Sequence, residues 1–200
     1  RALRARAEAE AEKSKVVEQY LVGVFGAADP FEPPESRPRD ITARALLDRG
    51  AQSIDTALAD QPAVRAELRG ALGRVYADLA LYDGAAIQLR RSLAERRAVY
   101  GPRHPEVAEA MDQLGRVLYQ EGRLDEADTL LRAALAQRRQ LFGDRSDATA
   151  ESLDHLGELL ENRDDFAGAE PLFREALATR RALHGDGDLT VAAAQDHLAT

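Results

Sequence analysis

The chain has 200 residues, with no cysteine, no tryptophan, five tyrosines and five phenylalanines. Without cysteine it can form neither a disulfide framework nor a thiolate site. No run of 18 apolar residues occurs, so no segment is predicted to insert directly into a membrane. The formal net charge of −8 argues against a nucleic-acid partner, because such binding relies on clustered lysine and arginine. Alanine and leucine dominate the apolar residues, a composition suited to close helix-on-helix packing.

The most informative feature is a repeat with a step of 42 residues. It relates Gly73, Gly115 and Gly157, and each of these glycines follows a leucine. The same step relates alanines, leucines, arginine pairs and turn glycines: Ala85, Ala127 and Ala169; Leu93, Leu135 and Leu177; Arg96-Arg97, Arg138-Arg139 and Arg180-Arg181; Gly101, Gly143 and Gly185. A fixed period of this size indicates a solenoid of stacked units.

Each unit has the pattern of a helix A, a tight turn, a helix B and a longer loop. We therefore predict an all-α fold with a repeat domain over residues 41–200. It comprises a half-repeat at 41–59, repeats at about 62–101, 104–143 and 146–185, and a partial repeat at 188–200. The chain starts without methionine and stops inside a repeat, so we expect it to be a fragment of a longer protein.

The segment before the repeats divides into two parts. Residues 1–25 are predicted to form a long helix, charged in its first half and carrying an apolar stripe from Val16 to Phe25. This helix is either solvated in its first half or a coiled-coil linker. Residues 26–40 contain four of the eight prolines and are predicted to be an extended connector.

The repeated residues resemble the tetratricopeptide repeat, which has a large apolar residue, Leu-Gly and Tyr or Leu in helix A, and Ala, Phe or Leu, and Ala in helix B. The second and third units match as follows: Met111, Leu114, Gly115, Leu118, Ala127, Leu131 and Ala134; Leu153, Leu156, Gly157, Leu160, Ala169, Phe173 and Ala176. The first unit departs from the pattern at Arg69 and Ser92. The 42-residue step exceeds the usual period of about 34 residues and resembles the kinesin-light-chain type.

This resemblance implies a right-handed superhelix of antiparallel helix pairs whose inner surface, lined mainly by A helices, binds peptides or protein segments. It also implies which residues line that groove: Glu67, Gly70, Arg74, Asp78, Glu109, Asp112, Arg116, Gln120, Glu151, Asp154, Glu158, Asn162 and Asp196. Most of these are acidic, which predicts a groove suited to a basic segment. The alternative is an ordinary solvated face of an acidic protein.

A second resemblance concerns the N-terminal region. Residues 17–25, 28–30 and 42–51 are similar to the region that follows the membrane span in bacterial serine/threonine protein kinases with C-terminal tetratricopeptide repeats. It implies a scaffold or sensor module of a membrane-anchored kinase, lying outside the cytoplasm. The alternative is a cytosolic tetratricopeptide adaptor or peptide-responsive regulator. In either case, an exposed apolar end at Leu198 would favour a homodimer.

We predict no enzyme activity within these residues, and neither a cofactor nor a metal. No phosphate-binding loop and no kinase catalytic loop occurs. His155 and His197 are one period apart, but two histidines in separate repeats rarely make a metal site without further ligands. The acidic pairs at turns, such as Asp164-Asp165, are better explained by helix capping than by acid–base catalysis.

Overall fold

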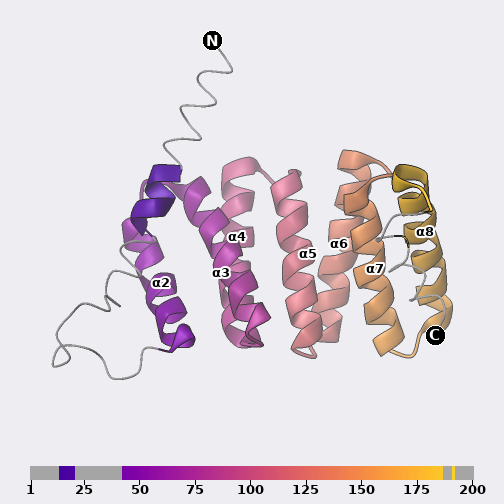
Figure 1. Cartoon of the computed structure of the whole chain (residues 1–200), viewed down its shortest axis with the longest axis horizontal. Coiled ribbons are helices and arrows are strands. Elements are labelled where there is room, and N and C mark those ends of the chain that lie inside the picture. The colour runs from indigo at the N-terminus through magenta and orange to yellow at the C-terminus, as the bar shows by residue number, and fades with distance from the viewer. Residues whose placement is uncertain (1–13, 21–41, 187–190, 192–200) are drawn as a thin grey trace, which may run out of the picture.

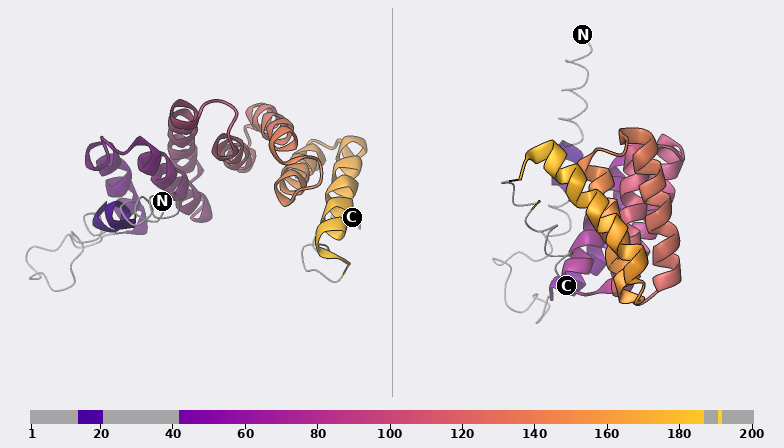
Figure 2. Two further views of the ribbon diagram at one scale, coloured as in Figure 1. Left: turned by 90° about the horizontal axis from the view of Figure 1, so that it is seen from above. Right: turned by 90° about the vertical axis from the view of Figure 1, so that its right-hand side faces the viewer.

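The computed structural model describes residues 14–20, 42–186 and 191, and its regular elements are all helices. Residues 14–20 are helical, and seven further helices follow: α2 (Ala43–Ala57), α3 (Pro62–Asp78), α4 (Tyr82–Tyr100), α5 (Pro105–Gln120), α6 (Leu124–Phe142), α7 (Asp147–Asn162) and α8 (Phe166–His184). They stand side by side along the long axis of the molecule (Figure 1). Seen from above, they follow an arc (Figure 2).

The helices are arranged in pairs. α3 packs on α4, α5 on α6 and α7 on α8, and each pair also contacts the next through α4–α5 and α6–α7. The A helices of neighbouring pairs touch as well, α3 with α5 and α5 with α7. The predicted all-α solenoid of antiparallel helix pairs is therefore confirmed.

The repeated glycines lie where the two helices of a pair cross. A Cβ atom on Gly73 would lie 2.6 Å from Leu89 Cγ, and one on Gly115 would lie 2.8 Å from Leu131 Cγ. Real Cβ atoms do not approach other atoms so closely, so only glycine fits here with these packed side chains. This requirement explains why glycine recurs at positions 73, 115 and 157.

Helix ends repeat as regularly as the core. Each B helix ends at a glycine with a φ near +80°, and its N–H donates to the carbonyl of the second arginine of the pair: Gly101 to Arg97, Gly143 to Arg139 and Gly185 to Arg181. The positive φ favours glycine, which fixes the start of each long loop. At the start of α7, the Ser146 hydroxyl caps the helix by accepting from the Thr149 N–H at 3.2 Å.

Residues 14–20 pack against the first helices of the stack. Tyr20 is buried and donates its hydroxyl hydrogen to the carbonyl oxygen of Gly50 at 2.7 Å. Val16 and Val17 contact the apolar cluster that contains Ile54 and Leu58. At the other end, Val191 packs on Leu177.

The predicted connector at 26–40, the first half of the N-terminal helix and the partial repeat apart from residue 191 lie outside the described residues. Among the helices that the structure does describe, none is long and apolar enough to cross a membrane.

Candidate functional site

A groove with a volume of about 900 Å³ runs across the A helices near the middle of the solenoid. α3, α5 and α7 supply most of its wall, and α4 and α6 supply the rest. Seven of the residues predicted for the groove line it: Arg74, Asp78, Glu109, Asp112, Arg116, Gln120 and Glu151. Sequence reasoning did not assign Val75, Arg138 and Phe142 to it, although all three contribute to the wall.

The charge of this groove is mixed. Its lining contains four carboxylates and three guanidinium groups, so it is less acidic than the sequence predicts. Apolar side chains are also exposed within it, because Val75 is 43% and Phe142 45% exposed. The groove can therefore offer both apolar contact and opposite charges to a ligand.

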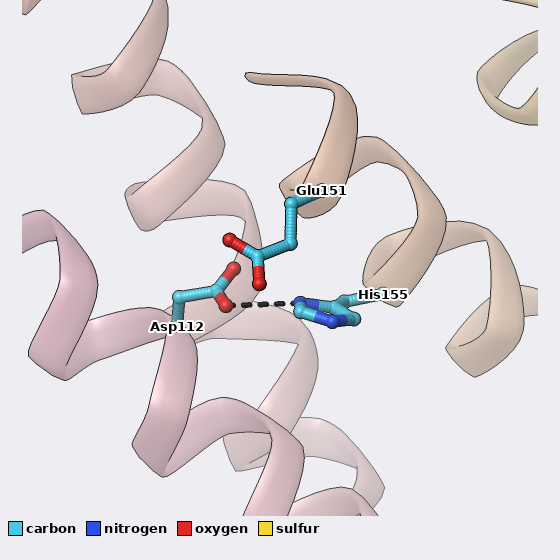
Figure 3. A group of neighbouring side chains, drawn as sticks. All are labelled: Asp112, Glu151 and His155. Atoms are coloured by element: carbon cyan, nitrogen blue, oxygen red, sulfur yellow. Dashed lines mark hydrogen bonds and ion pairs between the residues drawn. The ribbon is translucent and has the colours of Figure 1, made fainter. Parts of the chain in front are cut away.

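Asp112 lies at the centre of a buried polar network. It is 2% exposed, accepts a hydrogen bond from Ser152 Oγ at 2.8 Å, and lies 2.9 Å from Nδ1 of His155 (Figure 3). Burial alone would raise the pKa of Asp112. The hydrogen bond and charge of His155, the Arg138 guanidinium and the Ser152 hydrogen bond outweigh burial and lower that pKa. Asp112 is therefore a structural carboxylate, and His155 is its partner.

Arg138 links three helices of two repeats. From α6, its Nη1 atom lies 3.5 Å from Asp112 on α5. The same atom donates to the Ala148 carbonyl and to Ser152 Oγ on α7, both at 2.9 Å, and it lies 3.1 Å from Glu151. Arg138 thus joins the second repeat to the third and satisfies the carboxylates in that part of the groove.

The same pairing recurs one period later, because Arg180 of α8 donates to Asp154 of α7. Asp154, like Asp112, is buried. The first arginine of each pair accordingly points into the stack. In the sequence, the signal for this pairing is the constant spacing of 26 residues from Asp112 to Arg138 and from Asp154 to Arg180.

The remaining predicted groove residues are dispersed. Glu67 is exposed on α3, and Glu158 and Asn162 lie towards the end of α7, outside the groove lining. Asp196 lies outside the described residues. The assignment of the whole set to partner binding stays a prediction.

Asp112, Glu151 and His155 come close enough to be considered as metal ligands. Their ligand atoms all lie within 4.8 Å of one another, and the side chains point toward a common centre (Figure 3). The Arg138 guanidinium, however, already contacts both carboxylates. The positive charge in this cluster therefore comes from arginine, and a cation would have to compete with it.

Antiparallel helix pairs that repeat every 42 residues, with a groove along the A helices, define a helical-repeat solenoid. A family model for the tetratricopeptide repeat matches residues 64–136 and 113–182. The chain belongs to the tetratricopeptide repeat family. A search of curated proteins finds no significant match.

Solved structures place the fold close to kinesin light chains. The chain is similar to BtubC (BKLC) from P. vanneervenii, with 20% identity, a TM-score of 0.63, and coverage of 94% of this chain and 82% of that one. It is also similar to a Podosopora anserina kinesin light chain with nearly identical TPR-like repeats, with 15% identity, a TM-score of 0.63, and coverage of 94% and 85%. At these identities the likeness concerns the fold alone.

Proposed function

We propose that this chain is a non-catalytic interaction module that binds a protein segment in the groove between α3, α5 and α7. Tetratricopeptide domains typically bind proteins or peptides, and their fold is generally non-catalytic. The observation that carries the proposal is the groove itself, in which exposed apolar side chains lie beside charged groups. An extended or helical segment would cover this apolar surface and pair with the charges around it.

The preferred segment is basic over the second and third repeats. Glu109 and Glu151 keep side-chain exposures of 44% and 51% in this part of the groove, although each has a guanidinium within reach. Lysine or arginine side chains of a ligand would complement these carboxylates and orient the segment.

The test is a selection of random displayed peptides on the 200-residue chain, followed by fluorescence polarisation with the peptides obtained. Phe142→Ala removes an exposed ring from the groove, and we expect it to weaken binding about tenfold, as for a residue worth 1.4 kcal/mol. Phe166→Ala is the matched control, because Phe166 is 61% exposed and does not line the groove. Equal affinity of the two variants would place binding elsewhere.

We further propose that the parent protein is a membrane-anchored bacterial serine/threonine protein kinase, with this region outside the cytoplasm as its scaffold or sensor. The support is that residues 17–25, 28–30 and 42–51 resemble the region that follows the membrane span in bacterial kinases with C-terminal tetratricopeptide repeats. Self-association of the repeat end would bring two kinase domains together. The sequence upstream of Arg1 tests the parentage, since it should encode a kinase domain and an apolar span. Their absence would overturn the parentage and leave the groove proposal standing.

A further inference from the structure

The first repeat lacks a carboxylate that the second and third repeats hold. Asp112 pairs with Arg138, and Asp154 pairs with Arg180, in each case 26 residues apart and inside the stack. The equivalent pair in the first repeat is Gly70 and Arg96. The arginine is therefore kept, while glycine stands at the position of the aspartate.

Arg96 is buried like its counterparts, with an exposure of 3%. Its Nη1 atom donates to the Glu106 carbonyl at 2.9 Å and lies 2.9 Å from the Glu106 carboxylate and 3.8 Å from Glu109. These two carboxylates are 41% and 44% exposed, whereas the Asp112 side chain is only 3% exposed. Arg138 also has an exposed carboxylate nearby, because Glu151 lies 3.1 Å away and is 51% exposed, so the difference between the two arginines is the buried aspartate that Arg96 lacks.

A second guanidinium points to the same place. A Cβ atom on Gly70 would lie 3.2 Å from Arg96 Nη2, 3.3 Å from Ser92 Oγ and 3.9 Å from Arg74 Nη1. Gly70 and Arg96 are buried, and Arg74, which is exposed and lines the groove, is the member of this group that a ligand in the groove contacts first. Two cations thus converge where the other repeats have an aspartate side chain.

We propose that Gly70, Arg74 and Arg96 form a binding site for an aspartate or glutamate side chain of the segment that occupies the groove. The incoming carboxylate restores in trans the pair that the next two repeats make internally. Two guanidinium groups provide the forked donors that carboxylates bind best. This inference rests on the proposed function and adds the orientation of the bound segment. The acidic side chain of the segment lies over the first repeat, and its basic side chains lie over the second and third repeats.

The first experiment needs no peptide. Sodium acetate is titrated into the 200-residue chain, with sodium chloride at matched ionic strength as the reference, and the arginine Nε–H signals are followed by NMR. We expect saturable shifts at Arg96 and Arg74 with a Kd on the order of 10 mM, as for a single small-ion contact. The signals of Arg138 and Arg180 serve as internal controls and should move no more than with chloride.

Gly70→Asp supplies the carboxylate in cis and should weaken the acetate response at least about tenfold, because the new side chain occupies the site. The Cβ atom introduced by Gly70→Asp would lie 3.2 Å from Arg96 Nη2 and disturb the packing, so a second variant that keeps Gly70 is needed as well. Arg74→Gln alters an exposed side chain and should weaken the response several-fold without loss of helix content. An acetate response that is equal at Arg96, Arg138 and Arg180, or that survives both substitutions, would overturn the proposal.

Peptides selected on the wild-type chain separate this proposal from the proposed function. Replacing an internal Asp or Glu of such a peptide by Asn or Gln should weaken binding to the wild type but not to Gly70→Asp. Peptides that bind in the groove without any acidic side chain would overturn this inference alone. Loss of binding on C-terminal amidation, without an effect of the internal substitution, would assign the site to a chain terminus and also overturn it. An acetate response without any groove-binding peptide would count against the proposed function alone.

Discussion

Replacing Asp112 by alanine should destabilise the solenoid by about 3 kcal/mol. Breaking a buried ion pair by removing one partner costs about 3–5 kcal/mol, because the other charge stays buried. The lower value applies because Arg138 keeps the Ala148 carbonyl, Ser152 and Glu151 as partners. Asp128→Ala is the control. Its carboxylate pairs along the same helix with Arg132, which is 55% exposed, so the loss should be about 0.5 kcal/mol or less.

The effect should depend on pH in a defined direction. The pKa of Asp112 is lowered in the folded chain, so its contribution is fully present above the unfolded pKa of about 3.9 and is lost as the pH falls through the folded value. The difference in unfolding free energy between wild type and Asp112→Ala should therefore shrink as the pH falls below about 4.

Urea unfolding followed by far-UV circular dichroism measures this difference, since the chain has no tryptophan to report on packing. Hydrogen exchange adds spatial resolution and should show the loss of protection concentrated in α5, α6 and α7, where the network lies. A loss below about 1 kcal/mol, or one equal to that of Asp128→Ala, would refute the view that this carboxylate stabilises the junction of the repeats.

Two further substitutions test the packing. Gly115→Ala should destabilise by about 1–3 kcal/mol in thermal or urea unfolding, because the added Cβ would lie 2.8 Å from Leu131 Cγ; a gain from better helix propensity would show that the leucine moves aside at little cost. Tyr76→Phe removes a hydrogen bond of 2.6 Å from the phenol to Asp48, which links α3 to α2, and should cost about 1 kcal/mol. Burial, and after it the hydrogen bond and charge of Asp48, raise the pKa of Tyr76 well above its usual range, so the stability difference between wild type and Tyr76→Phe should be constant from pH 6 to pH 9. An unfolding midpoint equal to that of the wild type would contradict this prediction.

The fold could be predicted from the sequence because its determinants are local and repeated. Gly73 and Leu89 are both visible in the 42-residue register, and their contact needs no knowledge of distant residues. The groove positions on the A helices could be carried over in part, because Arg74 and Arg116 line the groove whereas Glu67 and Glu158 do not.

Whether an acidic side chain of the site faces solvent or forms an ion pair could not be predicted in the same way. An aspartate on a polar helix face is compatible with both solvent and an ion pair, and only the reach of Arg138 from α6 decides between them. Val75 illustrates the same limit for apolar residues. It shares its repeat position with Val117, and both residues line the groove, yet Val117 is 5% exposed and part of the core, whereas Val75 is 43% exposed.

The unequal pairing along the stack makes the solenoid mechanically uneven. Only exposed glutamates pair with the arginine at the junction of the first and second repeats, whereas at the next junction the arginine pairs with a buried aspartate as well as with the exposed Glu151. Dissolved salt screens exposed charges far more than buried ones. As ionic strength rises, the curved array should soften first between α4 and α5, so that the N-terminal part bends relative to a stiffer remainder.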